Sequence, residues 1–110
     1  MTTDVSDLPA PVAAAIDAAN AHDFDAFIAC FAPDGVVDDW GREFRGPRQI
    51  RAWSDTEFIG VRVSLEVTEV SSRNGTTVVT AKVGGDGFNG PSHFEFEVEA
   101  ERVVRMTIRA

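Results

Sequence analysis

Residues 93–109 read HFEFEVEAERVVRMTIR, and apolar side chains alternate with polar ones on both sides of Ala100-Glu101-Arg102. A period of two is typical of strands with one buried and one exposed face. Alignment of the two apolar faces predicts an antiparallel hairpin with three apolar pairs: Phe94 with Ile108, Phe96 with Met106, and Val98 with Val104. The same register places Glu97 opposite Arg105. It requires a loop at 100–102 or a longer one, although no glycine is present there to adopt a left-handed conformation.

Two further strands are expected before this hairpin. Apolar residues alternate with polar ones from Val61 to Val67, so a half-buried strand is predicted to begin at Val61. Asn74-Gly75 is a strong signal for a tight turn, and residues 76–83 return as the next strand. The glycine-rich stretch at 84–91 lacks the Lys-Ser/Thr ending of a phosphate-binding loop. It is therefore interpreted as a long turn.

The first half of the chain has the spacing of helices. Apolar residues recur at helical positions from Leu8 to Ala19, with Ser6 and Asp7 as expected N-terminal caps. Asp23 is the expected N-cap of a short second helix, whose apolar stripe comprises Phe24, Phe27, Ile28 and Phe31.

A third helix is predicted to begin at Gly46-Pro47, with Ile50, Trp53 and Phe58 near one face. Residues 36–44, between the second and third helices, read as a short hairpin that turns near Gly41. Helices that precede a run of antiparallel strands predict an α+β fold, with three helices covering one face of a curved sheet.

Composition excludes several classes of function. The chain has 110 residues, which suits a single domain over residues 1–110. Ten basic residues against 18 acidic ones give a net charge of −8, the opposite sign to that of a nucleic-acid binder. No stretch approaches the ~20 apolar residues that span a membrane, and the acidic start does not resemble a signal peptide. With one cysteine, Cys30, and no intrachain disulfide possible, we expect a cytoplasmic protein.

The sequence also lacks the motifs of metal and cofactor sites. It contains no cysteine pair, no His-x-His and no His-Glu-x-x-His, so neither a metal nor a cofactor is expected. A nucleophilic hydrolase is not expected either, because no Gly-x-Ser-x-Gly motif is present.

Three segments resemble the SnoaL-like branch of the nuclear transport factor 2 (NTF2-like) superfamily: residues 20–27 (NAHDFDAF), 31–39 (FAPDGVVDD) and 44–50 (FRGPRQI). The resemblance extends from about Val12 to Ile108. It implies a cone in which a strongly curved, mostly antiparallel sheet wraps three N-terminal helices and leaves an apolar pocket at the open end. Members of this superfamily include ketosteroid isomerase, polyketide cyclases, epoxide hydrolases, dehydratases and proteins without catalysis. The fold therefore does not decide the function.

The resemblance points to Asp39 as the catalytic residue, because it matches the position of the general base in the isomerase and cyclase branches. A carboxylate that faces an apolar cavity loses hydration and takes up a proton more readily. In the alternative interpretation, Asp38 and Asp39 are solvated residues of an edge hairpin. Consecutive strand residues point to opposite faces, so at most one of the two enters a pocket.

The donors that the isomerase uses for its enolate are missing. The sequence contains no tyrosine, and the two donor positions fall near Ala15 and Phe94. Preorganised donors usually supply the largest catalytic contribution. Steroid isomerisation is therefore not expected.

We expect the pocket to bind a small hydrophobic molecule, with walls formed by Trp40, Trp53, Phe27, Phe31, Phe94, Phe96 and Met106. If the protein is an enzyme, the reaction is of the isomerase, cyclase or dehydratase type, with Asp39 as base. The alternative is a non-catalytic ligand-binding or interaction domain on the same scaffold. The resemblance also implies a homodimer through the outer face of the sheet, whose expected charged residues are Arg62, Glu66, Lys82, Glu95, Glu97 and Arg105.

Overall fold

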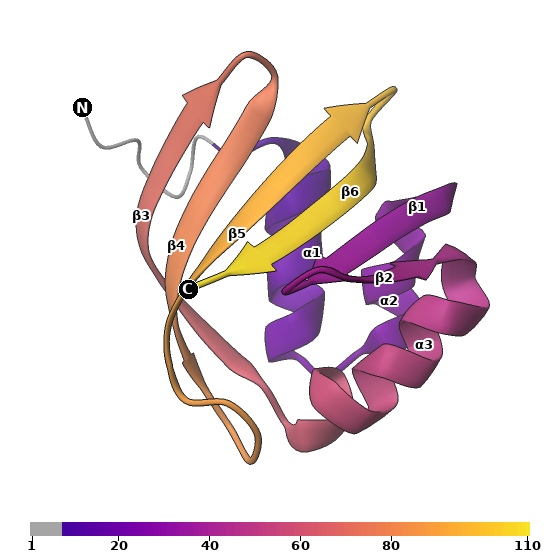
Figure 1. Cartoon of the computed structure of the whole chain (residues 1–110). Helices are drawn as coiled ribbons and strands as arrows, with labels where there is room; N and C mark the ends of the chain where they lie inside the picture. The colour runs from indigo at the N-terminus through magenta and orange to yellow at the C-terminus, as the bar shows by residue number, and fades with distance from the viewer. Residues whose placement is uncertain (1–7) are drawn as a thin grey trace.

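The computed structural model describes residues 8–110, which form three α-helices and a sheet of six strands (Figure 1). In chain order the elements are α1 (Ala10–Asn20), α2 (Phe24–Ala29), β1 (Phe31–Asp39), β2 (Arg42–Arg45), α3 (Gly46–Glu57), the 3₁₀ helix η2 (Ile59–Val61), β3 (Ser64–Arg73), β4 (Thr76–Gly84), β5 (Gly90–Glu99) and β6 (Arg102–Arg109). Most of the helical residues thus precede most of the sheet, as the change of period predicts.

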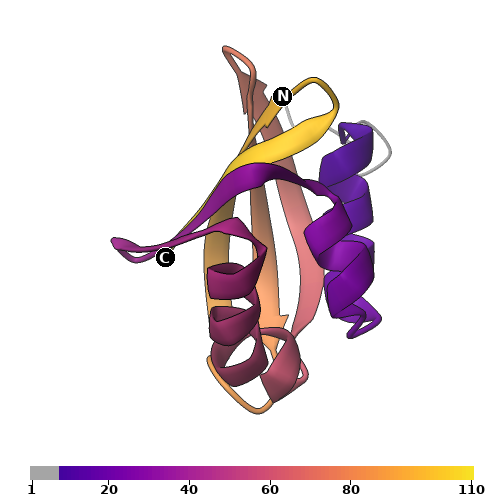
Figure 2. The same cartoon turned by 90° about the vertical axis from the view of Figure 1, so that its right-hand side faces the viewer.

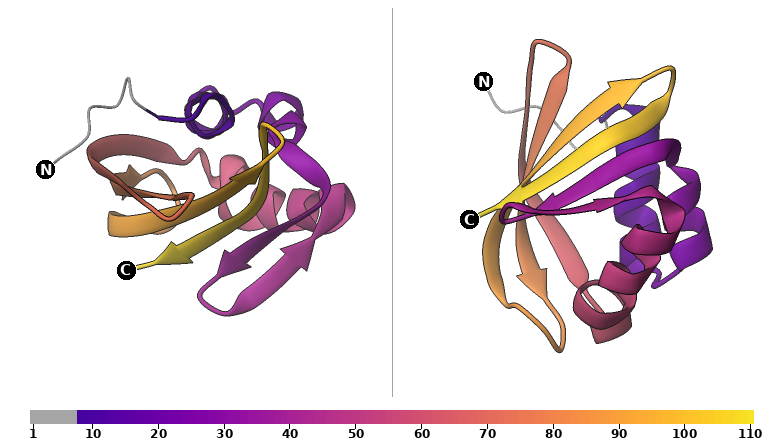
Figure 3. Two further views of the ribbon diagram at one scale, coloured as in Figure 1. Left: turned by 90° about the horizontal axis from the view of Figure 1, so that it is seen from above. Right: turned by 45° about the vertical axis from the view of Figure 1, so that its right-hand side comes forward.

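The six strands form one mixed sheet in the order β2-β1-β6-β5-β4-β3. Neighbouring strands are antiparallel except for β1 and β6, which are parallel. The sheet curves around the helices, which lie on its inner face (Figures 2 and 3). The predicted α+β fold, with three helices packed on a curved and mostly antiparallel sheet, is therefore confirmed.

The hydrophobic core lies between the helices and the inner face of the sheet. Val12 of α1, Phe27 of α2 and Ile50 of α3 are almost fully buried, together with Phe96 and Met106 of the sheet. Burial of an apolar side chain of this size contributes about 1.5–3 kcal/mol. This packing holds three helices of different orientation against one sheet.

The helix starts agree with the sequence where they can be compared. The Asp23 side chain accepts a hydrogen bond of 3.1 Å from the Ala26 N–H and caps α2 as predicted. Pro47 lies in the first turn of α3, where the missing N–H removes no helical hydrogen bond. The expected caps Ser6 and Asp7 lie outside the described residues, and Pro9 occupies the N-cap position of α1.

The register of the C-terminal hairpin is mostly as predicted. Three expected pairs are present: Phe94 with Ile108, Phe96 with Met106, and Glu97 with Arg105. The predicted pair of Val98 with Val104 is wrong. The register shifts after Glu97, so Val98 faces Val103 instead. The shift buries Val103 completely and lets its N–H donate to the Cys30 carbonyl at 2.8 Å.

Phe31 begins β1 and does not belong to the second helix, so that prediction is wrong. Pro33 favours an extended conformation for the residue before it, which allows a strand to start earlier than the expected Val36. At Gly35 a Cβ would stand 3.1 Å from two backbone carbonyl oxygens, so glycine fits this close approach best. The register with β6 shifts between Phe31 and Val36, which absorbs the irregular segment.

The strand expected to start at Val61 begins at Ser64. Val61 ends η2, and Arg62 has a left-handed φ of 55°, which interrupts an extended chain. Gly60 allows this tight path, because a Cβ there would overlap the backbone of α3. Arg62 therefore does not lie on the outer face of the sheet, and its guanidinium pairs with Asp86 at 2.9 Å.

The two-residue turn at Ala100-Glu101 predicts a simple route to a more stable protein. Its φ angles are 50° and 63°, close to those of Asn74 and Gly75 at 51° and 81°. Alanine and glutamate adopt this region at a cost of about 1–2 kcal/mol each, whereas asparagine and glycine adopt it readily. The double change Ala100→Asn and Glu101→Gly is expected to raise the free energy of unfolding by about 1–2 kcal/mol in urea denaturation, less than the sum of the two costs because glycine loses more conformational entropy on folding.

The reciprocal change at the other hairpin is the matched control. Asn74→Ala combined with Gly75→Glu is expected to lower the free energy of unfolding by a similar amount. Equal stability of all three proteins would contradict the assigned strain.

Candidate functional site

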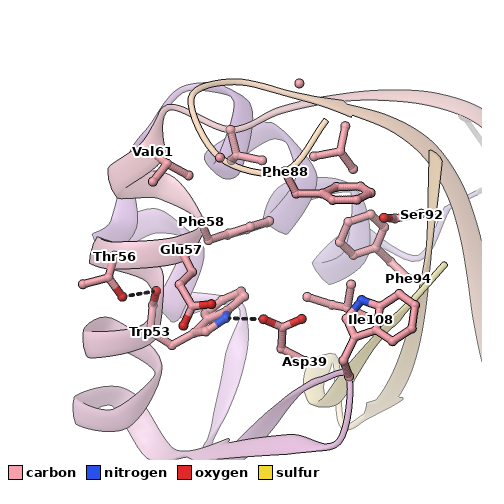
Figure 4. Close-up of a pocket in the computed structure, with 15 residues that line it drawn as sticks. Asp39, Trp53, Thr56, Glu57, Phe58, Val61, Phe88, Ser92, Phe94 and Ile108 are labelled. Carbon is pink, nitrogen blue, oxygen red and sulfur yellow. Dashed lines mark hydrogen bonds between the residues drawn. The ribbon is translucent and has the colours of Figure 1, made fainter. Parts of the chain in front are cut away.

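A pocket of about 330 Å³ opens where β1 ends. Its walls come from the end of α3, from η2, from the β1–β2 turn, from the β4–β5 loop and from the inner face of the sheet. Most of the lining is apolar, including Trp53, Phe58, Val63, Val83, Phe94 and Ile108 (Figure 4). The pocket therefore favours a ligand with a largely hydrophobic body.

Asp39, the last residue of β1, presents its carboxylate to this pocket. Its side chain is 16% exposed. The Oδ2 atom accepts hydrogen bonds from Trp53 Nε1 at 3.0 Å and from the Arg42 guanidinium at 2.7 Å. In Figure 4 the other oxygen points toward the cavity, and no residue from 8 to 110 donates to it. The carboxylate thus has a fixed orientation and one oxygen available to a ligand.

Arg42 joins Asp39 to a second carboxylate at the pocket, that of Glu57. Its Nη1 and Nη2 atoms donate to the two Glu57 oxygens at 3.0 and 2.6 Å. These bonds, with a smaller contribution from Asp39, raise the pKa of Arg42 above its ordinary value. Both oxygens of Glu57 are therefore occupied by charge-assisted hydrogen bonds from one guanidinium.

Trp53 positions the carboxylate from within the core. Its side chain is 2% exposed and stacks on Phe58, with ring centroids 4.9 Å apart, and on Phe44 at 6.1 Å. A ring held on two sides cannot rotate without disturbing the packing. The direction of its N–H, and with it the orientation of Asp39, is fixed by aromatic packing.

Two exposed aromatic rings line the mouth of the pocket. Trp40 in the β1–β2 turn is 60% exposed, and Phe88 in the β4–β5 loop is 59% exposed. Trp40 has a left-handed φ of 55°, and its backbone N–H donates to the Ile108 carbonyl at 3.3 Å. Large apolar groups left in water at the entrance of a cavity suit contact with a hydrophobic ligand.

The structure brings together only some of the residues that the sequence suggests. Asp39, Trp40, Trp53 and Phe94 line the pocket. The other expected wall residues are core residues outside the pocket lining: Phe27, Phe31, Phe96 and Met106, which are 1–3% exposed. Each packs against a helix or a neighbouring strand residue, so the inner face is filled there.

Sequence reasoning missed eleven of the fifteen lining residues, and five of these eleven supply polar groups or aromatic rings to the pocket: Thr56, Glu57, Phe58, Phe88 and Ser92. One of them carried a readable signal. Ser92 lies two residues before the inward-facing Phe94, so the alternation of β5 places it on the inner face. Glu57 and Phe88 carry no comparable signal, because a helix end and a loop place them.

The neighbouring Asp38 points to the opposite face of the sheet. It is 6% exposed and pairs with Arg105 and, at 3.1 Å, with Arg109. The Gly41 N–H donates to it at 2.7 Å. The Arg109 hydrogen bond is the largest cause that lowers the pKa of Asp38 below its ordinary value, and Gly41 and Arg105 add to it. Of the two aspartates only Asp39 enters the pocket, and neither is a solvated edge residue.

Two structural findings bear on other classes of function. Within residues 8–110 no group of three or more His, Cys, Asp or Glu side chains is arranged to hold a metal ion. Over the same residues, no helix has the length and apolar character needed to cross a membrane.

Several solved structures share this architecture. A protein from Sinorhizobium meliloti, provisionally assigned as a polyketide cyclase, is 28% identical with a TM-score of 0.84, covering 97% of this chain and 100% of that one. A Catenulispora acidiphila protein with a ketosteroid isomerase-like fold, in complex with trimethylamine, is 22% identical (TM-score 0.77; coverage 93% and 85%). A computationally designed 17-OHP binder is 19% identical (TM-score 0.76; coverage 92% and 88%). A comparison with curated proteins gives no match.

The curved sheet, its three helices and the similarity to these structures show an NTF2-like fold. The family model of the SnoaL-like domain matches residues 12–106, nearly the whole chain. The chain belongs to the SnoaL-like domain family.

The ion pairs of Asp38 predict an effect on stability that depends on pH. Asp38→Asn is expected to lower the free energy of unfolding at pH 7 by about 1–3 kcal/mol, because it leaves two arginines without their buried partner. A lowered pKa in the folded state gives stability that is present above about pH 4 and is lost as the pH falls further. The difference between wild type and Asp38→Asn should therefore shrink between pH 5 and pH 3, as urea denaturation at each pH can measure.

Asp34→Asn, at an exposed position of the same strand, is the control and should change stability little at either pH. A difference between wild type and Asp38→Asn that stays constant with pH would contradict the assigned ion pairs.

Proposed function

We propose that this pocket binds a small, mostly hydrophobic molecule and that Asp39 acts as a general base on it. The observation that carries the proposal is the arrangement of one carboxylate. Its Oδ2 is held by Trp53 and Arg42, whereas its Oδ1 faces an apolar cavity. A general base must be oriented and within reach of the proton that it removes, and the two hydrogen bonds to Oδ2 support the orientation.

The reaction class follows from what Asp39 can do. Its Oδ1 takes a proton from carbon, and the electron pair of the broken C–H bond moves onto the substrate. The proton then returns to another atom in an isomerisation, or the carbanion forms a ring or expels a leaving group. A carboxylate is a moderate base. Such a base suits a C–H bond that is already acidic, such as one beside a carbonyl group.

The S. meliloti protein supports this reaction class, since it is provisionally assigned as a polyketide cyclase. The match covers 97% of this chain and 100% of that one. Polyketides carry carbonyl groups beside acidic C–H bonds on a largely apolar skeleton. A substrate of that kind fits both the apolar walls and the single exposed carboxylate oxygen.

A non-catalytic ligand-binding protein is the second candidate. The observation that favours it is the Arg42 bridge, which neutralises part of the charge on Asp39 and Glu57. The sequence also contains no tyrosine to stabilise an enolate. The two candidates differ in whether Asp39 accelerates a reaction or only contacts a ligand.

Hydrogen–deuterium exchange distinguishes the two candidates without knowledge of the natural substrate. In D₂O, the wild-type protein is expected to accelerate exchange of the methyl hydrogens of 2-acetylnaphthalene, followed by NMR. Asp39→Asn should reduce this acceleration by about a hundredfold or more, in line with the loss of a general base. Binding of the ketone should change by less than about threefold, because the base acts mainly in the transition state.

Asp34→Asn serves again as the control, with one carboxylate removed from the same strand and the pocket left intact. A wild-type protein that binds the ketone without accelerating exchange would favour the non-catalytic candidate. So would acceleration that persists in Asp39→Asn.

We also propose that the protein forms a homodimer through the outer face of the sheet. Glu66, Lys82, Glu95 and Glu97 are exposed in the strands, and Arg105 is partly exposed beside them. Because such a surface is charged, the interface is expected to be polar and to weaken at high salt.

Sedimentation at micromolar concentration should therefore show a dimer that dissociates as the ionic strength rises. Glu97→Arg is expected to weaken the dimer. Asp25→Arg changes the net charge equally on α2, on the other side of the sheet, and should not affect the dimer. A monomer at low salt would contradict the proposal.

A further inference from the structure

Most polar groups that line the pocket already have partners within the protein. The Thr56 hydroxyl donates to backbone carbonyls of its own helix at 3.1 and 3.3 Å. The Trp53 N–H is bound to Asp39, and both oxygens of Glu57 are bound to Arg42. These groups orient the wall and leave little hydrogen-bonding capacity for a ligand.

Ser92 is different. It lies on the inner face of β5 and is 3% exposed, yet no residue from 8 to 110 forms a hydrogen bond with its hydroxyl. The atom is nevertheless not sealed inside the protein, since the buried side-chain oxygen and nitrogen atoms of the described residues all have partners. The Ser92 hydroxyl must therefore contact the pocket, which its side chain lines (Figure 4).

Within the described part of the chain, the Ser92 hydroxyl makes no hydrogen bond that contributes to the fold. A hydroxyl at a mostly apolar, largely enclosed wall gains more from a ligand partner than one at the open surface of a protein. The neighbouring inward residues of the sheet, Phe94 and Ile108, are apolar and show that an apolar side chain fits this wall. The hydroxyl is therefore available to pair with a ligand atom in the pocket.

We propose that Ser92 donates a hydrogen bond to a neutral carbonyl oxygen of the ligand. The ligand would place this oxygen at Ser92 and its apolar body against the apolar walls of the pocket. Among the described residues no lysine, arginine or histidine lines the pocket. A ligand whose oxygen belongs to a carboxylate or phosphate would find no cationic lining residue there, and Arg42 is already paired with both Asp39 and Glu57. The site thus selects uncharged ketones or esters.

This inference rests on the proposed ligand-binding pocket but not on the role of Asp39 as a base. Its test uses binding alone, with two probes of similar shape. The ketone 2-acetylnaphthalene can accept a hydrogen bond, whereas 2-isopropylnaphthalene cannot. Wild-type protein is expected to bind the ketone more tightly than the hydrocarbon.

Ser92→Ala should weaken binding of the ketone by about three- to tenfold, the usual net value of one hydrogen bond. Binding of the hydrocarbon should change by less than about twofold. The carbonyl stretch of the bound ketone should move to higher frequency in the variant, since its hydrogen bond is lost. Thr56→Val is the matched control, because it removes a hydroxyl from the same pocket that is already bound to its own helix.

The melting temperature gives a second readout. If Ser92 had only a structural role, its removal would lower the melting temperature. Ser92→Ala should melt at the same temperature as wild type or higher, because the change removes an unpartnered hydroxyl. Equal losses for both probes, an unchanged carbonyl frequency or a lower melting temperature would overturn the proposal. So would a wild-type protein that binds neither probe. The wild-type protein could also show the expected binding results and yet fail to accelerate exchange. This outcome would support the role of Ser92 and contradict only the role of Asp39 as a base.

Discussion

The end of β1 depends on one geometric constraint: consecutive side chains of a strand point to opposite faces of the sheet. Asp38 and Asp39 are neighbours in sequence and have no surroundings in common. Asp38 lies beneath Arg105 and Arg109 on the outer face, and Asp39 meets Trp53 and Arg42 on the inner face. β1 therefore cannot slide relative to β6 without breaking the ion pairs of Asp38, or relative to α3 without breaking the hydrogen bond between Trp53 and Asp39. The position of the candidate base is therefore fixed from two sides.

The shape of the core explains why the pocket lies where it does. Phe27 packs against Phe31 at 5.1 Å and against Phe58 at 5.5 Å, so aromatic rings fill the space between α2 and the start of β1. At the other end of β1 no ring of the helices reaches the sheet beyond Trp53 and Phe58, and a cavity remains. Its floor is thus made of the same aromatic stack that stabilises the protein. A ligand in this cavity contacts the stabilising core directly.

Patterning of polar and apolar residues predicted the fold well, since it depends on many residues at once. Burial of one face of the sheet decides the register of Phe94 and Phe96. The φ angles of a tight turn decide the position of Asn74-Gly75. The errors arose where one backbone contact decides the outcome. Val103 replaces Val104 opposite Val98 through a single bulge, and residues 60–62 leave the strand because of a close approach to α3.

The site was less predictable, because it joins residues from a strand end, a helix end and a loop. A family resemblance could place Asp39, but no local pattern shows that its partners are Arg42 and Glu57.

The distribution of hydrogen bonds around the pocket suggests how one scaffold separates stability from function. Trp53, Thr56 and Glu57 have their polar groups satisfied by the protein, so each contributes to folding whether or not a ligand is present. Asp39 Oδ1 and the Ser92 hydroxyl contribute nothing to folding in this way. A polar atom that the fold does not use, in a cavity that the fold does not fill, is available to pair with a ligand. Those two atoms, an acceptor and a donor on an otherwise apolar surface, therefore describe the ligand more directly than the remainder of the fold does.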